Sequence, residues 1–143
     1  MKVGLVVVLY NFKESFFENL ELLKKYADFI VLVDNSSVSS NNLFEKYVDN
    51  SLVYIPLYGN LGIATALNKG MEECINKHCD WVLNLDQDST FYNNIIEVYR
   101  KYIENNTCTN VIGLCPQYFT YQNDPSLNES SIKVKETIQS GTL

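Results

Sequence analysis

The chain has 143 residues, 46% of them hydrophobic and 20% charged, which suits one globular domain with a single core. Its formal net charge of −6 argues against a general nucleic-acid surface, because such a surface needs clustered lysine and arginine. No apolar stretch approaches the roughly 18 to 20 residues of a membrane span, and the first apolar run lacks the cleavage site of a secretion signal.

Short apolar runs alternate with longer amphipathic runs along the chain. The first, residues 3–9, is unbroken and β-branched, which is typical of a strand buried on both faces. The pattern predicts strands at residues 3–9, 29–33, 52–57, 81–85 and 111–114, with a weaker candidate at residues 131–138. The polar residues 36–42 and 122–131 are predicted to be loops.

Helical spacing marks the segments between these strands. Residues 15–18 (Ser-Phe-Phe-Glu) fit a capping box, and a short helix is expected at residues 43–48. The apolar faces predicted by the spacing are Phe16, Leu20, Leu23 and Ala27; Ile63, Leu67, Met71, Cys74 and Ile75; and Ile95, Val98, Tyr99, Tyr102 and Ile103. The second of these helices is expected to run to about His78. Strands and helices in alternation predict an α/β fold with a mostly parallel central sheet and helices on both faces.

The cysteines give no sign of a metal or disulfide framework. Cys74, Cys79, Cys108 and Cys115 form no Cys-x-x-Cys pair and no cluster with the single histidine, His78. We therefore expect free thiols in a reducing cytoplasm.

Polar residues gather where the predicted strands end. Tyr10 and Asn11 follow the first strand, Asp34 and Asn35 the second, residues 59–62 the third and residues 86–88 the fourth. In open α/β sheets, ligands bind at the carboxyl ends of the strands, where loops and helix amino termini converge. This coincidence at four strand ends predicts a binding site.

The most specific element is Asp86-Gln87-Asp88. Two carboxylates one residue apart can face a common point if the turn is tight. A hard cation such as Mg²⁺ or Mn²⁺ takes one or two protein carboxylates and completes its shell with water and phosphate oxygens. The alternative is purely structural, with Asp86 capping a turn and Asp88 beginning the next helix.

Two further elements have a binding and a structural interpretation. Residues 60–64 (Asn-Leu-Gly-Ile-Ala) offer backbone N–H groups to an anion at a helix start, or form a simple turn in which Asn60 caps the helix. Asp34 either accepts hydrogen bonds from a base or ribose, or caps the loop that it opens. Tyr10, at a strand end, is the tyrosine expected to contact a base.

Together these segments resemble glycosyltransferase family 2, and especially its bacterial rhamnosyltransferase-like branch. The segments that carry the resemblance are residues 6–11, 30–37, 60–64, 66–70, 83–89 and 140–141. The form Leu-Asp-Gln-Asp-Ser at residues 85–89 is similar to the metal-binding motif common in that branch. The resemblance covers essentially the whole chain, in order and with natural spacing.

The resemblance implies a GT-A fold, that of the nucleotide-diphospho-sugar transferases, and roles for individual residues. Asp34 would hold the base, Asn60 and Asn68 would line the nucleotide site, and Asp86 and Asp88 would hold Mg²⁺ or Mn²⁺ and the diphosphate. The donor-binding residues implied are Tyr10, Asn11, Asp34, Asn60, Gly62, Asn68, Asp86 and Gln87. The family's acidic general base has no counterpart in the sequence, so the catalytic base is unknown and expected beyond Leu143. Residues 1–143 are accordingly expected to be the nucleotide-sugar-binding half of a GT-A domain truncated at its C-terminus.

The family further implies inverting, metal-assisted sugar transfer from a nucleoside diphosphate, with dTDP-rhamnose favoured as donor by the Leu-Asp-Gln-Asp-Ser form. The acceptor would be a saccharide or a lipid-linked saccharide, in cell-surface polysaccharide synthesis. The protein is expected in the cytoplasm, either in solution or at the inner face of the membrane. Self-association is expected if apolar sheet surface is left uncovered.

Two other functions stay open on the residues. The first is a nucleotide-sugar-binding module without catalysis, which a downstream acidic base would argue against. The second is a sugar nucleotidyltransferase, which expects a glycine-rich loop with a basic residue after the first strand. Residues 10–14 (Tyr-Asn-Phe-Lys-Glu) occupy that place without a glycine.

Overall fold

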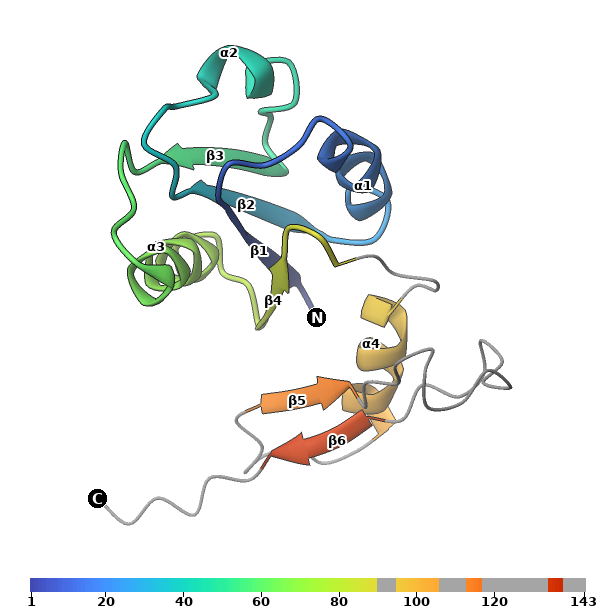
Figure 1. Ribbon diagram of the computed structural model, residues 1–143. Helices are drawn as coiled ribbons and strands as arrows, with labels where there is room; N and C mark the ends of the chain where they lie inside the picture. Colours follow the sequence, from blue (N-terminus) through green and yellow to red (C-terminus); the bar gives the residue numbers. More distant parts are fainter. Residues whose placement is uncertain (90–94, 106–112, 117–133, 138–143) are drawn as a thin grey trace, which may run out of the picture. The chain divides into compact units, whose positions relative to one another are not determined.

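The computed structural model describes residues 1–89, 95–105, 113–116 and 134–137, the last two ranges for their backbone alone (Figure 1). The chain divides into two compact units, Met1–Thr90 and Phe91–Leu143. The predicted loop at residues 122–131, Cys108 and the pair Ser140 and Gly141 lie outside the described residues.

The first unit is built on a four-stranded sheet in which every neighbouring pair is parallel. Its strands are β1 (Val3–Leu9), β2 (Phe29–Asp34), β3 (Leu52–Pro56) and β4 (Trp81–Asp86), in the spatial order β3-β2-β1-β4. The four strands predicted from apolar runs are thereby confirmed, with bounds within one residue. β1 and β2 lie in the middle and are almost wholly buried, as their unbroken apolar sequences predict.

Helices cover both faces of this sheet, as the alternation of elements predicts (Figure 1). One face carries α3 (Ile63–Asn76), whose Ala66 and Cys74 form a core cluster with Val6 of β1 and three residues of β2. Side chains alternate between the faces of a strand, so Leu5, Val7 and Leu9 point to the other face. They are fully buried there, on the side of α1 (Phe16–Leu23) and α2 (Asn41–Phe44).

Only part of the face predicted for α3 is buried: Cys74 is buried and Leu67 packs against the core cluster, as predicted. Ala66, Gly70 and Cys74, four residues apart, are the buried residues, whereas Ile63 and Ile75 are 57% and 67% exposed. The reason is how close the helix approaches the sheet. A Cβ atom on Gly70 would lie 2.3 Å from Cγ1 of Val6, so small residues must face β1 and larger ones are displaced to the sides.

The capping box predicted at residues 15–18 is wrong. Ser15 has helical dihedral angles (φ −57°, ψ −18°), and its side chain makes no capping hydrogen bond. A capping residue normally has extended backbone, which lets its side chain reach back to the first turn. Backbone bonds close this turn instead, from Phe16 N–H to the Lys13 carbonyl at 2.9 Å and from Phe17 N–H to the Glu14 carbonyl at 3.0 Å.

Two other helix predictions need correction. α1 ends at Leu23, so Ala27 lies beyond the helix and the turn that follows it, and is half-buried. The short helix expected at residues 43–48 lies at Asn41–Phe44. Its position follows from Phe44, which is fully buried and stacks on Tyr54 of β3 with ring centroids 4.5 Å apart.

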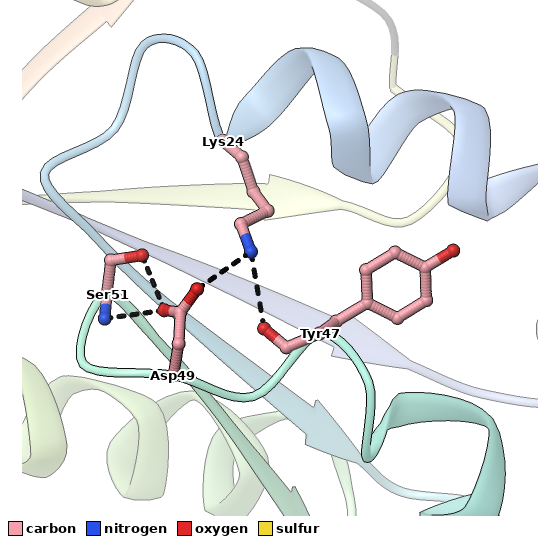
Figure 2. Close-up of polar contacts among 4 residues, drawn as sticks. All are labelled: Lys24, Tyr47, Asp49 and Ser51. Carbon is pink, nitrogen blue, oxygen red and sulfur yellow. Dashed lines mark hydrogen bonds and ion pairs between the residues drawn. The ribbon is translucent and has the colours of Figure 1, made fainter.

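An ion pair ties the end of α1 to the turn that precedes β3 (Figure 2). Lys24 Nζ lies 3.0 Å from Asp49 Oδ2 and donates to the Tyr47 carbonyl at 3.3 Å. Asp49 Oδ1 accepts from the N–H and the hydroxyl of Ser51 at 2.7 and 2.6 Å. The Ser51 hydrogen bonds, with help from Lys24, hold the pKa of Asp49 well below its usual range. This contact lies at the amino end of β3. It is therefore at the edge of the sheet opposite the one where the strands have their carboxyl ends.

The second unit contains α4 (Ile95–Asn105), β5 (Gly113–Pro116) and β6 (Val134–Thr137). β5 and β6 are antiparallel, with Gly113 opposite Thr137. The strands predicted at 111–114 and 131–138 overlap them, while residues 111–112, 131–133 and 138 lie outside the described part of the chain. Across the residues that the structure covers, no helix has the length and apolar character needed to span a bilayer.

Candidate functional site

The carboxyl ends of the four parallel strands meet along one edge of the sheet. In the register, Leu9 at the end of β1 pairs with Asp34, and Asp34 pairs with Pro56. On the other side of β1, Val8 pairs with Asp86. The polar segments that follow these strands are therefore neighbours in space, as the sequence predicts.

The turn after β1 is held from both sides. Tyr10 N–H donates to Gln87 Oε1 at 2.8 Å, and Gln87 Nε2 donates to the Tyr10 carbonyl at 3.1 Å. Asn11 N–H donates to Ser36 Oγ at 2.8 Å, from a backbone with φ of 45°. Tyr10 is 48% exposed, so it is accessible to a ligand at this edge.

Asp34 is buried and already hydrogen-bonded within the protein. The residue is 1% exposed; Oδ1 accepts from Ser36 N–H at 3.0 Å and Oδ2 accepts from the Tyr54 hydroxyl at 2.5 Å. The Tyr54 oxygen in turn accepts from Ser40 N–H at 2.9 Å. Burial, together with the hydrogen bond to Asp34, raises the pKa of Tyr54 to about 12. Any contact from Asp34 to a base must use the lone pairs that these two donors leave open.

Asn35 and Asn60 shape the loop between β3 and α3. Asn35 Nδ2 donates to Asn60 Oδ1 at 3.1 Å, and Asn35 Oδ1 accepts from Leu61 N–H at 2.8 Å. Asn60 Oδ1 also accepts from Gly62 N–H at 3.1 Å. The strand-end pattern places Asn35 among the polar residues of this edge, without a role of its own, and gives no indication of Tyr54. The contact between Tyr54 and Asp34 depends on the register of β2 and β3, for which the sequence gives no signal.

α3 begins at this edge with free backbone donors. Gly62 precedes the helix with φ of 86° and ψ of 152°, a conformation that favours glycine. The first hydrogen bond of the helix runs from Ala66 N–H to the Gly62 carbonyl at 3.2 Å. The N–H groups of residues 63–65 therefore have no acceptor within the helix. Such a terminus attracts anions. Asn68 lies about 200° around the helix from buried Ala66 and Gly70, is exposed, and stands outside this network.

Asp86 and Asp88 flank Gln87 on a tight turn after β4. Ser89 N–H donates to the Asp86 carbonyl at 3.0 Å, and Asn19 of α1 donates to the Ser89 carbonyl at 2.9 Å. Both aspartates are exposed, and within the described residues neither carboxylate accepts a hydrogen bond or pairs with a cation. The same part of the chain holds no group of three or more Asp, Glu, His or Cys side chains suited to a metal. Two oxygen donors fit a hard cation that takes its remaining ligands from water and phosphate.

A shallow hollow of about 350 Å³ lies between α2 and β3. Its lining residues are Asn41, Phe44, Glu45, Val48 and Tyr54. It shares only Tyr54 with the hydrogen-bond network around Asp34. None of the predicted donor-binding residues lines it, so the candidate site is the strand edge rather than this hollow.

Comparison with known families adds an independent finding to this geometry. The family model described as Glycosyl transferase family 2 matches residues 5–141, a range that contains every candidate site residue. A search of the curated proteins found no match for the chain.

Proposed function

Because this chain belongs to glycosyltransferase family 2, we propose that the carboxyl edge of its parallel sheet binds the nucleoside diphosphate-sugar from which a sugar is transferred to an acceptor. The family supports glycosyl transfer in general.

The observation that carries the proposal is the convergence of three binding elements at one edge. These are the exposed carboxylates of Asp86 and Asp88, the half-exposed ring of Tyr10 and the free N–H groups at the start of α3. An aromatic face suits a planar base, and N–H groups at a helix start suit a phosphate. A nucleoside diphosphate contains both chemical features.

The carboxylates of Asp86 and Asp88 suit a divalent cation such as Mg²⁺ or Mn²⁺. When bound, such a cation would neutralise the charge that develops on the departing nucleoside diphosphate. Without it, two exposed carboxylates beside a diphosphate would repel the donor. The acidic pair therefore supports a metal-dependent reaction.

The remaining assignments follow the family resemblance. We propose inverting transfer, with an acceptor hydroxyl attacking the anomeric carbon from the face opposite the leaving group. The donor favoured by the Leu-Asp-Gln-Asp-Ser form of residues 85–89 is dTDP-rhamnose. The acceptor proposed is a saccharide or lipid-linked saccharide of a cell-surface polysaccharide.

Calorimetric titration of the chain with UDP, GDP and dTDP tests the proposal, in Mn²⁺ and again in EDTA. We expect one of these nucleotides to bind in Mn²⁺ and to bind at least tenfold more weakly in EDTA. The double variant Asp86→Asn and Asp88→Asn should bind equally weakly in both conditions, because it keeps the side-chain size and loses the charges. If the parent binds none of the three, or the variant keeps the Mn²⁺ effect, the assignment of this edge is wrong.

A further inference from the structure

The carboxamide of Gln87 continues the sheet beyond the point where β4 ends. β1 and β4 pair in register up to Val8 and Asp86. Beyond them, the N–H and the carbonyl of Tyr10 would have no partner from β4. Gln87 supplies both, since Oε1 accepts from Tyr10 N–H at 2.8 Å and Nε2 donates to the Tyr10 carbonyl at 3.1 Å.

This pairing matters because the turn after β1 has an unfavourable backbone. Asn11 has φ of 45°, in the left-handed region that non-glycine residues rarely adopt, although asparagine tolerates it better than most. Contacts from outside the turn must therefore hold it. Ser36 does so from the side of β2 at Asn11, and Gln87 does so from the side of β4 at Tyr10.

The same pairing restrains the turn that bears the two exposed aspartates. Gln87 stands between Asp86 and Asp88, and its side chain is anchored on the backbone of Tyr10, in the turn after β1 and 77 residues away in sequence. Anchoring Gln87, a central residue of the turn that the Ser89 N–H closes on the Asp86 carbonyl, restricts the directions in which its neighbours can point. The two carboxylates and the Tyr10 ring are thus linked through one side chain.

The structure assigns Gln87 the role of a positioning residue that holds Tyr10 and the aspartates Asp86 and Asp88 in one geometry. This inference rests on the proposed function, and it gives Gln87 a different role from the donor contact expected from the sequence. Glutamine suits the role chemically. Glutamate would keep the acceptor but oppose the Tyr10 carbonyl and add a third negative charge, and asparagine is one methylene too short.

The test uses Gln87→Met, which keeps the length of the side chain and removes both hydrogen-bonding groups. Gln87→Asn is the milder variant, and Asn42→Ala is the control because it removes an exposed amide from α2 that makes no described side-chain contact. Three quantities are measured on the full chain: the hydrogen-exchange rate of the Tyr10 amide by NMR, the affinity for Mn²⁺ alone, and the affinity for dTDP and UDP in Mn²⁺.

We expect Gln87→Met to raise the exchange rate of the Tyr10 amide at least tenfold, since Gln87 is the acceptor for that N–H. Affinity for Mn²⁺ and Mn²⁺-dependent nucleotide affinity should each fall about tenfold, or about 1.4 kcal/mol. Nucleotide affinity in EDTA should change less. The amide spectrum away from the two turns should stay as in the parent, and Asn42→Ala should change none of the three quantities.

Three results would overturn the inference. The first is an unchanged exchange rate at Tyr10, and the second is faster exchange with unchanged affinity for Mn²⁺ and nucleotide. The third is an equal loss of affinity with Asn42→Ala. If the parent binds neither dTDP nor UDP, the proposed function is wrong. The positioning role of Gln87 is then still tested by the exchange rate of the Tyr10 amide and the affinity for Mn²⁺.

Discussion

The hydroxyl of Tyr54 donates to Oδ2 of Asp34 at 2.5 Å, across the boundary between β3 and β2. Asp34 is 1% exposed, and its other carboxylate oxygen accepts from Ser36 N–H. A buried carboxylate is costly unless hydrogen bonds compensate for the lost water. This contact therefore stabilises the charge of Asp34 and also holds Ser40, whose N–H donates to the same tyrosine oxygen.

Replacing Tyr54 by phenylalanine should leave Asp34 Oδ2 without this donor. We expect the free energy of unfolding to fall by about 1.5 to 3 kcal/mol, the range for hydrogen bonds to charged groups. Urea unfolding at pH 7 measures the change. Tyr58→Phe is the matched control, because Tyr58 is 67% exposed and makes no described side-chain contact. If Tyr54→Phe lowers the free energy of unfolding no more than Tyr58→Phe does, the hydrogen bond from Tyr54 to Asp34 does not stabilise the fold.

Gly70→Ala tests how closely α3 approaches the sheet. In an exposed helix this change stabilises by up to about 1 kcal/mol, because alanine is the better helix former. Here the new Cβ would lie 2.3 Å from Val6 Cγ1, so we expect a loss of about 1 to 3 kcal/mol instead. Adding Val6→Ala should recover part of the penalty in a double-mutant cycle.

Thermal or urea unfolding measures whether Gly70→Ala raises or lowers the free energy of unfolding, and the sign of this change tests the prediction. Gly59→Ala is the control, since a Cβ there would meet no atom within 4 Å. Stabilisation by Gly70→Ala would show that α3 lies further from β1 than the structure has it.

Acid should weaken the link between Lys24 and Asp49. The pKa of Asp49 is lowered in the folded chain, chiefly by the Ser51 hydrogen bonds and then by Lys24, from an ordinary value of 3.8. A group with a lowered folded pKa contributes stability above its unfolded pKa, and that contribution is lost as the pH falls through the folded pKa. Stability from Asp49 is thus present at pH 5 to 7 and declines below about pH 4.

Asp49→Asn should therefore be less stable than the parent at pH 7, and the difference should shrink as the pH is lowered to 2. Because the pair is partly exposed to solvent, the difference is expected to stay below about 1 kcal/mol. Urea unfolding across this pH range measures it. Glu21→Gln is the control, an exposed carboxylate on α1 without a described partner. A difference that grows towards pH 2 would contradict the prediction.

The thiols of Cys74 and Cys79 should react slowly. Burial raises the pKa of Cys74 to about 12 and also raises the pKa of Cys79, and the thiolate is the reactive form. In a chain carrying Cys108→Ser and Cys115→Ser, a disulfide reagent at pH 8 should label half-buried Cys79 slowly, and Cys74 only as fast as the chain unfolds. Mass spectrometry of timed samples measures both rates. Fast labelling of Cys74 in the folded chain would contradict its burial.

The sequence by itself determined the four parallel strands and the edge where their polar ends meet. An unbroken apolar run such as residues 3–9 must be buried on both faces of a strand, and the local sequence alone is enough to show this. The positions of Tyr10, Asp34 and Asp86 at strand ends follow from the same pattern. These three residues lie at one edge of the sheet because parallel strands all have their carboxyl ends there.

Only the tertiary structure decided which side chains bond to each other at that edge. Gln87 and Tyr10 are 77 residues apart, and their pairing depends on where β4 stops beside β1. Tyr54 meets Asp34 because the register of β2 and β3 brings both residues to one face, and no local pattern encodes that register. The buried face of α3 was decided in the same way. Gly70 faces Val6 because the helix approaches the sheet closely, whereas hydrophobic periodicity alone assigns that face to larger residues.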